Sequence, residues 1–386
     1  MDTTSNYTVR QSVLDDIPDI MRLYDYSRQL MRDNGNASQW VDGYPSLAQI
    51  TDDINRGESY VIVDDEKIEG VFAFILGKDP TYDKIEGGEW IADDQPYGTI
   101  HRIAKSADAK GIFDTCLEWC KKQILTIRVD THRDNRIMLN LMERYGFVYS
   151  GIIYVADGTP RLAFQMTDTH TLCEPLQLYI EQEIIPRYKE FDSAHNIDHA
   201  RTVISNSLQL AEHHDVNINM VYTIAAYHDI GLVAGRERHH IVSSELLQDD
   251  KMLRKWFSLG QIETMAEAVE DHRASSGHEP RSIYGKIVAE ADRDIDPIKI
   301  VRRTIQYGLN HYPELEKEAH WKRAVDHLNE KYAEGGYLTL WLPESPNAQK
   351  LEKLRLLISN KKDLRELFER IFENENGKNK RNEQHY

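Results

Sequence analysis

The spacing of apolar residues changes near residue 170, and this change constrains the fold more than any other feature of the chain. From 7 to 166, runs rich in β-branched and aromatic residues alternate with helical patterns. From 175 onward, apolar residues recur at helical spacing and hardly any strand pattern remains. The sequence therefore predicts a two-domain α+β protein, in which a domain with a central mixed sheet precedes an all-α helical bundle.

The N-terminal pattern predicts a sheet flanked by helices. The strand "YTVRQS" precedes the helix "DDIPDIMRLYDYSRQLM", and "SYVIVDDEKIEGVFAFILG" reads as a hairpin. Next come the strand "YGTIHRIAK", the helix "GIFDTCLEWCKKQ", the strand "TIRVDTH" and the helix "RIMLNLMERYG". A last hairpin turns at "ADGTP" before the strand "RLAFQM". We place this domain at 1–168 and a linker at 169–174.

The second domain, with a helical C-terminal extension, is expected at 175–375. Its predicted helices cover 175–191, 197–213, 219–230, 240–248, 261–273, 282–292, 297–308, 316–333 and 347–373. The segment "KYAEGGYLTLWLPES" is aromatic for a linker; we expect it to pack on the helices, with a pocket wall or a subunit contact as the alternatives. The polar tail 376–386 has no apolar face, so we expect it to be disordered.

Charge and cysteine content exclude several classes of protein. The chain has 47 Lys and Arg against 64 Asp and Glu, a net charge of -17, which disfavours nucleic acid or anionic membrane as a partner. A local basic pocket could still bind phosphate. Three cysteines do not suggest a disulfide framework, and neither a signal segment nor a spanning segment is evident. We therefore expect a cytoplasmic protein.

Histidines are concentrated in one part of the second domain. Nine of the 16 lie between 195 and 278. His199, His272 and Asp292 each lie one helical turn from a valine, so they should face an apolar interior. Burying imidazole and carboxylate groups costs several kcal/mol unless they are paired or coordinated. A metal site accounts for their convergence most simply.

Five ordered motifs, "HNIDHARTV", "AAYHDIGL", "RHHIVSS", "AVEDHR" and "AEADRDID", resemble those of HD-domain metal-dependent phosphohydrolases. The resemblance covers about 195 to 296. It implies that one metal is held by His199, His228, Asp229 and Asp292. It also implies that His240 and His272 hold a second metal, with Asp229 bridging the two; His239 competes with His240 for this role.

This ligand set suits iron, manganese or zinc. Two ions about 3.5 to 4 Å apart could activate a water and bind a phosphate oxygen, so the resemblance implies hydrolysis of a phosphorylated small molecule or nucleotide. For catalysis we single out Asp229 and His228, with His195, Arg273 and Lys286 toward the substrate. Further cations beside the motifs are Arg236, Arg238 and Arg293.

Other readings of the second domain stay open. Some HD proteins with the same six ligands are di-iron oxygenases, and ligand type does not separate them from hydrolases. Alternatively, neither domain is catalytic and both bind ligands as sensors. A further alternative places the main activity in the first domain, with the HD domain regulatory. A homodimer is compatible with the sequence.

The first domain resembles the GNAT acyltransferases over about 7 to 166, most clearly where "RYGF" follows "DTHRDN". The resemblance implies acetyl-CoA as cofactor, with its pyrophosphate at a strand end and a helix N-terminus. The implied contacts are Ile103, Ala104, Lys105, Lys110, Gly111, Ile112 and Asn135.

The sequence departs from the GNAT pattern in two places. The loop "SADAKGIF" keeps a single glycine, Gly111. Met142 stands where the family often has a tyrosine that protonates the CoA thiolate, and Tyr145 is on another helix face. His101 or His132 could act as the base.

Overall fold

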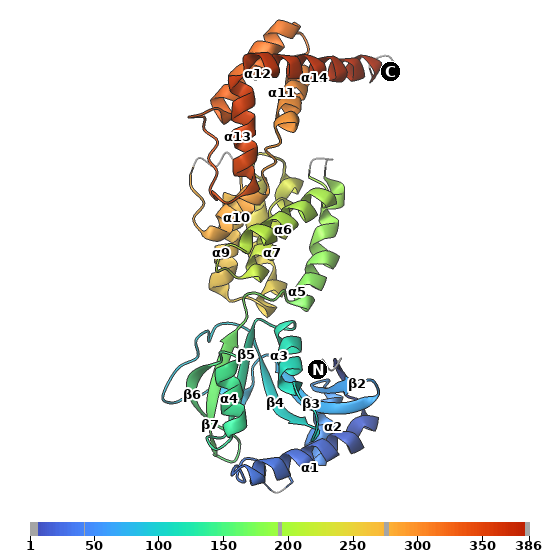
Figure 1. The fold of residues 1–386 in the computed structure, drawn as a ribbon, viewed down its shortest axis with the longest axis vertical. Coiled ribbons are helices and arrows are strands. Elements are labelled where there is room, and N and C mark those ends of the chain that lie inside the picture. Colours follow the sequence, from blue (N-terminus) through green and yellow to red (C-terminus); the bar gives the residue numbers. More distant parts are fainter. Residues whose placement is uncertain (1–6, 42, 192–194, 274–277, 383–386) are drawn as a thin grey trace. The chain divides into compact units, whose positions relative to one another are not determined.

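The structure is a computed structural model that describes residues 7–41, 43–191, 195–273 and 278–382. The chain forms two compact units. The first comprises Met1–Gln182, Asn217–Asn219 and Asp250–Ile262, and the second comprises the rest. The predicted two-domain α+β fold class is confirmed, with a mixed sheet in the first part and helices in the second (Figure 1).

A seven-stranded sheet forms the centre of the first unit, in the order β1-β2-β3-β4-β5-β7-β6. Its β4–β5 pair is parallel and the other neighbouring pairs are antiparallel. The strands are β1 (Thr8–Gln11), β2 (Ser59–Asp64), β3 (Lys67–Leu76), β4 (Tyr97–Lys105), β5 (Thr126–Thr131), β6 (Val148–Tyr154) and β7 (Pro160–Thr167). The alternating and β-branched runs predicted these strands well.

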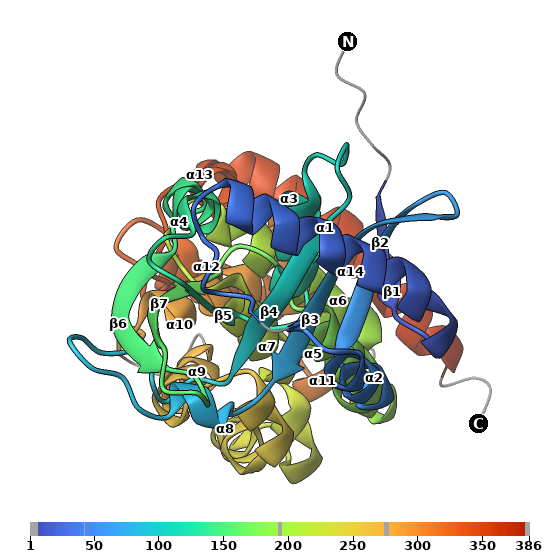
Figure 2. The same ribbon diagram turned by 90° about the horizontal axis from the view of Figure 1, so that it is seen from below.

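Helices cover both faces of this sheet. On one face, α1 (Ile17–Asp33) and α2 (Leu47–Asn55) pack on alternate residues of β2 and β3, and Figure 2 shows α1 running across the strands. On the other, α3 (Ile112–Lys121) and α4 (Arg136–Arg144) enclose a separate core. The sequence prediction missed α2, although the hydroxyl of Ser46 caps it by accepting a hydrogen bond from the backbone N–H of Gln49.

The parallel pair β4 and β5 separates partway along. The two strands pair from Tyr97 opposite Thr126 to Ile100 opposite Val129, and β4 then continues without β5 to Lys105. Arg102, just beyond the last pair, has a φ of 50°, and the β3–β4 register shifts at the same level. This irregularity bends β4 away from β5 and leaves an opening between them.

The second part of the chain is helical. Its elements are α5 (Glu174–Tyr179), α6 (Ile197–Ala211), α7 (Ile218–Tyr227), α8 (His239–Asp249), α9 (Leu259–Asp271), α10 (Ile283–Ala291), α11 (Pro297–His311), α12 (Lys317–Tyr332), α13 (Pro346–Ser359) and α14 (Lys361–Asn382). The last four helices enclose an apolar core of their own, which includes Leu354, Phe368 and Phe372.

Three predictions for this part are wrong in detail. The helix expected over 175–191 ends as α5 and continues as a π turn and then a 3₁₀ turn, because Pro186 cannot donate to the helical ladder. The helix expected over 347–373 is two helices that meet at Asn360. The tail expected to be disordered is helical to Asn382, because extending α14 is easier than starting a helix; residues 383–386 lie outside the described part.

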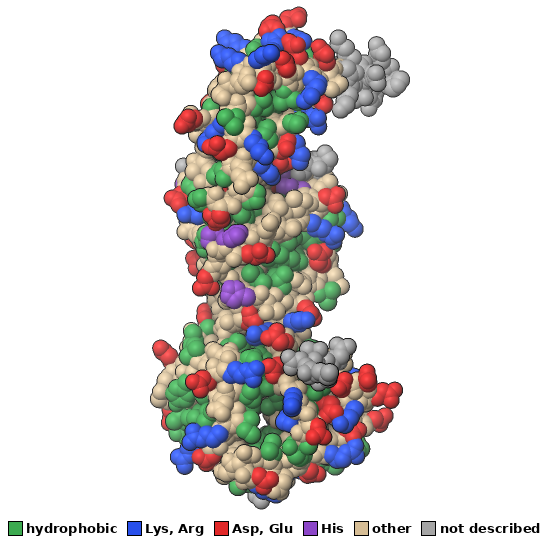
Figure 3. Space-filling model, viewed as in Figure 1, with side chains coloured by type: hydrophobic (Ala, Val, Ile, Leu, Met, Phe, Trp, Pro, Cys, Tyr) green, Lys and Arg blue, Asp and Glu red, His purple; other side chains and the backbone are tan. Residues whose placement is uncertain are grey.

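Charged side chains of both signs are interspersed on the face drawn in Figure 3, without a continuous basic area there. None of the helices in the described part of the chain is both long and apolar enough to cross a membrane.

Candidate functional site

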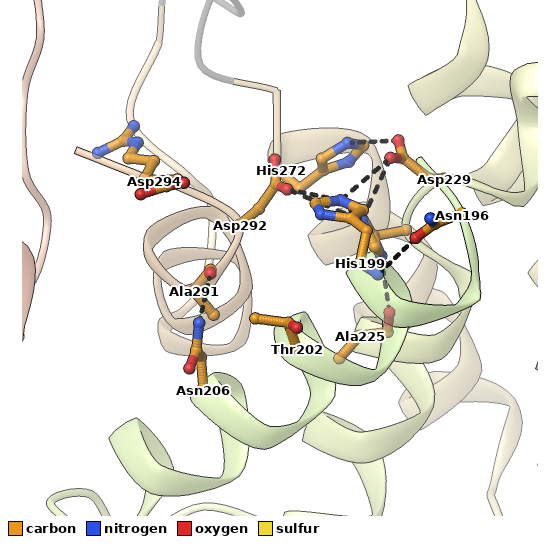
Figure 4. A network of polar contacts seen from close by, with 12 residues as sticks. Asn196, His199, Thr202, Asn206, Ala225, Asp229, His272, Ala291, Asp292 and Asp294 are labelled. Carbon is orange, nitrogen blue, oxygen red and sulfur yellow. Dashed lines mark hydrogen bonds and ion pairs between the residues drawn. The ribbon is translucent and has the colours of Figure 1, made fainter. Parts of the chain in front are cut away.

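The predicted metal ligands lie at helix ends in the second part of the chain. His228 and Asp229 follow α7, His272 follows α9, and Asp292 is the C-cap of α10. His199 is in the first turn of α6, whose N-cap Asn196 accepts from the backbone N–H of His199 at 3.0 Å. Figure 4 shows His199, His272, Asp229 and Asp292 pointing toward one another. Helix ends from distant parts of the sequence thus bring these groups together.

Asp229 lies at the centre of the group. Its Oδ2 is 3.3 Å from Nε2 of His228 and 3.6 Å from Nε2 of His199. Its Oδ1 is 3.4 Å from Nε2 of His239 and 3.5 Å from Nε2 of His272. Each carboxylate oxygen therefore faces a different pair of imidazoles.

Three of these imidazoles have their orientation fixed by the backbone. The Nδ1 atom of each lies within hydrogen-bond distance of the carbonyl oxygen three residues earlier: His228 with Ala225 at 2.7 Å, His272 with Val269 at 2.6 Å, and His239 with Arg236 at 2.8 Å. The carbonyls of Ala225 and Val269 lie in the last turns of α7 and α9, where carbonyl oxygens have no hydrogen-bond partner within the helix. Because Nδ1 donates, the neutral ring carries its lone pair on Nε2, toward Asp229.

The Nε2 atoms are close to one another. His239 and His272 approach to 3.3 Å between these atoms, as do His199 and His228. In the first pair both neutral rings present lone pairs, so the contact is repulsive unless a cation or a proton lies between them. Ligands bound to one ion at 2.0 to 2.1 Å are about 3.0 to 3.4 Å apart, which is the spacing observed.

Asp292 extends the group around His199. Its Oδ1 is 3.2 Å from Nε2 of His199 and 3.9 Å from Nε2 of His228. Burial opposes the charge on Asp292, but the hydrogen bond with His199 together with the charges of His228 and His272 outweighs burial and lowers the pKa of the carboxyl. Burial likewise lowers the pKa of His199, yet its bonds to Asp229 and Asp292 raise that pKa to about 9. The arrangement favours a positive charge at this position.

The structure places His239, rather than His240, beside Asp229. His240 follows on α8, and its ring centroid is 5.5 Å from that of His239. Burial and then the charge of Arg273 lower the pKa of His240. Gly231 permits this approach of α8, because a Cβ there would lie 2.2 Å from the carbonyl oxygen of His239. The motif "RHHIVSS" holds two adjacent histidines, and only the packing of α8 selects between them.

The other predicted catalytic groups are spread around the cluster. The ring of His195 is edge-on to His199 at 5.8 Å. Arg273 donates to the carbonyl of Glu237 at 2.8 Å, two residues before His239. Lys286 is paired with Glu279 at 2.5 Å.

Of the other cations beside the motifs, Arg293 contacts Glu290 and the carbonyl of Thr339. Its guanidinium is therefore shared between α10, through Glu290, and the C-terminal extension, through Thr339.

The donor set suits a transition metal. Imidazole nitrogens and carboxylate oxygens are ligands for zinc, iron and manganese. Two groups of side chains could each hold an ion: His199, His228 and Asp229, and Asp229, His239 and His272. Asp292 adds a fourth donor to the first group.

The opening between β4 and β5 in the first unit contains two cavities. The smaller, about 150 Å³, is lined by five of the seven residues predicted to bind acetyl-CoA. These are Ile103, Ala104, Lys105, Ile112 and Asn135. Lys110 and Gly111 belong to the loop before α3 but do not line it. Asn135 caps α4 by accepting from the N–H of Met138 and donates to Gln39 at 3.0 Å.

The loop before α3 is held by its own lysine. The ammonium of Lys105 donates to the carbonyls of Ser106, Ala107 and Ala109 at 2.9, 3.2 and 2.9 Å. Gly111 takes a φ of 74° as the N-cap of α3, a conformation that favours glycine. A positive charge therefore lies at the strand end where the resemblance implies a pyrophosphate.

The larger cavity, about 660 Å³, adjoins the smaller one, since Met31, Ile103, Asn135 and Met138 line both. It contains His101, whose Nε2 is 2.9 Å from Asp79 and whose Nδ1 is 3.8 Å from Asp130. The two candidate bases thus differ: His101 faces the larger cavity, and His132 lines neither one.

No tyrosine of α4 replaces Met142. Met142 is fully buried in the core between the sheet and α4. Tyr145 hydrogen-bonds to Asp114, and burial together with Asp114 raises its pKa to about 12. Tyr145 is not among the residues that line either cavity.

A model of the HD domain family matches residues 196–294. Among solved structures, the chain is similar to a GNAT-family acetyltransferase from Streptococcus agalactiae, at 32% identity over 42% of this chain and 95% of that one, with a TM-score of 0.39. A GNAT-family acetyltransferase from Listeria monocytogenes is 18% identical over 42% of this chain and 94% of that one, with a TM-score of 0.34. A predicted HD superfamily hydrolase from an uncultured Thermotogales bacterium is 22% identical over 39% of this chain and 83% of that one, with a TM-score of 0.28. No curated protein matches.

The first unit has a sheet that opens between the parallel strands β4 and β5, with a loop and a helix N-terminus at the end of β4. The second part has the helix-end cluster of histidines and aspartates within the matched segment. The chain is thus a fusion of a GNAT-like domain with an HD domain.

Proposed function

We propose that the HD domain is a metal-dependent hydrolase of phosphate esters or nucleotides, with two ions bound by His199, His228, Asp229, His239, His272 and Asp292. One observation carries the proposal: the two oxygens of Asp229 face two different pairs of Nε2 atoms, as a carboxylate bridging two ions would. The proposal replaces His240 of the sequence prediction with His239.

The two groups of ligands are unequal. Four side chains surround the first position, whereas Asp229, His239 and His272 supply three at the second. A position with three protein ligands leaves room for water and for a substrate oxygen, as in catalytic rather than structural metal sites. Bound ions would lower the pKa of a shared water and stabilise charge on a phosphate.

The protein groups around the ions hold them and receive the substrate. Nδ1 bonds to the backbone keep three imidazoles in the tautomer that binds metal. Arg273, held by the carbonyl of Glu237, is positioned on the side of His239 and is our choice for a phosphate contact. His195, edge-on to His199, is our choice for a second substrate contact.

The test is Asp229→Asn, which keeps the shape of the side chain but removes the charge needed by both ions. We expect loss of both metals by elemental analysis and at least a 100-fold loss of hydrolysis of bis(p-nitrophenyl) phosphate and of a nucleotide panel. Asp294→Asn is the matched control, because Asp294 is paired with Lys299 and points away from the cluster (Figure 4).

Metal-free wild-type protein with unchanged thermal stability on adding metal would contradict the metal centre. Oxygen uptake with a mixed-valence iron signal, and without phosphate release, would contradict hydrolysis and favour an oxygenase.

We also propose that the GNAT domain transfers an acetyl group from acetyl-CoA to an amine. The adjoining cavities support this, since five of the seven predicted cofactor residues line the smaller one and the larger one has a histidine–aspartate pair. In such a transfer the amine nitrogen bonds to the acetyl carbon and the carbon–sulfur bond breaks. Of the two protons that an ammonium acceptor loses, His101 would accept one and pass it to solvent, and the thiolate would take the other.

Release of CoA in the presence of amine panels tests this proposal. We expect His101→Gln to lower kcat by about 10²-fold, the ordinary contribution of a general base. Failure to bind acetyl-CoA would contradict it.

A further inference from the structure

The larger cavity of the GNAT domain contains charged groups of both signs on one face of the sheet. Asp130 of β5 lies opposite Ala163 of β7, and Ala163 shares a core cluster with Tyr82, which donates to Asp130 at 2.6 Å. Arg161 is two residues before Ala163 on the same strand and so points to the same face. Asp130 and Arg161 are therefore diagonal neighbours, roughly 7–8 Å apart between backbones.

The acidic end is made by Asp79 and Asp130 on either side of His101. Their side chains are 12% and 11% exposed, and His101 is the ion-pair partner that the described residues offer to each. The N–H of Thr81 donates to Asp79 at 2.9 Å, and burial is outweighed by hydrogen bonds from His101 and Thr81, which lower the pKa of Asp79 to about 2. This end of the cavity is anionic and has room for a cation.

The basic end is Arg161. Its residue is 7% exposed, and the hydrogen bond that its guanidinium makes to the described residues is to the carbonyl of Pro160 at 3.1 Å. Among the described residues, no carboxylate forms an ion pair with Arg161; the exposed Asp157 interacts with its charge from farther away. Burial lowers the pKa of His132, and the positive charge of Arg161 lowers it further. The guanidinium of Arg161 therefore lies near the end of β5.

The other arginines of this cavity are neutralised. Both Arg102 and Arg56 are paired with Asp53, and Arg56 is also paired with Glu58. Burying a guanidinium without a counter-ion is costly, so an unpaired Arg161 in a cavity points to a ligand that supplies the anion. The planar fork of a single guanidinium matches a carboxylate.

We propose that the acceptor of the GNAT domain is a zwitterion of the α-amino acid or short peptide class, with its amine at Asp79, His101 and Asp130 and its carboxylate on Arg161. The volume of about 660 Å³ is within the range of small-molecule sites. This inference rests on the proposed acetyl transfer but concerns binding, so the two can fail separately.

The experiment uses the whole chain. The compounds tested are the twenty common L-amino acids and dipeptides built from them, and each is compared with its C-terminal amide and its N-acetyl derivative. Binding is followed by calorimetry and transfer by CoA release. We expect at least one amino acid or dipeptide to bind at least tenfold more tightly than its amide. Arg161→Met should remove this preference while still binding the amide as wild type does, and Arg161→Lys should keep part of it. The exposed Arg22→Met is the control.

Different outcomes overturn different claims. The zwitterion inference would be overturned if amino acids and their amides bind equally well, or if no member of the panel binds. It would also be overturned if Arg161→Met keeps the wild-type preference for the free carboxylate. Binding with the expected preference but without CoA release would support the inference and contradict acetyl transfer. Acetylation of polyamines, with no amino acid bound, would contradict the inference and leave acetyl transfer standing. If Arg161→Met does not fold, Arg161→Lys and the amide comparison decide.

Discussion

The two candidate sites treat buried charge in opposite ways. In the HD domain, the ion-pair contacts of Asp229 and Asp292 among the described residues are all with histidines. In the GNAT domain, Arg102 is neutralised by Asp53. The first site therefore depends on a cation that the side chains do not supply, whereas the second has arginines of its own, of which Arg56 and Arg102 are paired with carboxylates and Arg161 is not. Metal should matter to the stability of one domain and not to that of the other.

The largest expected effect comes from metal removal. A ligand present at 1,000 times its Kd stabilises the folded state by about 4 kcal/mol, or roughly 10 °C for a domain of this size. We expect a chelator to lower one of two calorimetric transitions by about this amount and to leave the other unchanged. Two transitions that shift together, or neither shifting, would break the comparison.

The ligand assignment gives the next largest effect. His239→Ala should remove one of two bound metals and lower hydrolysis by at least about 10²-fold, because the second position keeps just two ligands. His240→Ala should stay within about twofold of wild type, since its ring does not face Asp229. Metal stoichiometry and phosphate release measure both variants. The reverse ranking would restore His240 as the ligand.

A packing variant separates geometry from chemistry. In Gly231→Ala the new Cβ meets backbone atoms of His239 and Ser243 at 2.2 and 2.4 Å, so α8 has to move. We expect a loss of about 1–3 kcal/mol and weaker binding of the second metal. Gly260→Ala is the control, because the nearest atom there is 4.0 Å away. Thermal melts with and without metal measure the difference, which should be larger with metal.

The smallest expected effect tests the GNAT domain with pH. The folded pKa of Asp79, about 2, is below its ordinary value of 3.8, so the carboxylate stabilises the fold above about pH 4 and loses this effect as the pH falls toward 2. Asp79→Asn should cost about 1–2 kcal/mol at pH 7 in the chelator-insensitive transition. The deficit should shrink only below pH 4. Asp94→Asn, at an exposed position, should change stability by less than about 0.5 kcal/mol.

Local patterns in the sequence were sufficient for most of the fold. Strand alternation and helical stripes predicted the elements of the sheet and seven of the helices after 196 to within a few residues. They missed α2 because nine residues give a weak stripe, and they joined α13 to α14 because the apolar spacing continues across Asn360.

The sites were less predictable. His199, His228 and His272 could be proposed from motif order, but choosing between His239 and His240 depends on how closely Gly231 lets α8 approach. Arg161 gave no signal at all. It looks like an ordinary strand residue until the β5–β7 register places it in a cavity beside Asp130.

The backbone carbonyls that hold the imidazoles have a consequence for dynamics. Ala225 and Val269 belong to last turns, where helices usually fray. A metal that immobilises His228 and His272 would also hold these carbonyls, and so tighten the ends of α7 and α9. Amide hydrogen exchange at these two helix ends should therefore slow when metal binds. Hydrogen exchange would then report metal occupancy independently of any spectroscopic signal from the metal itself.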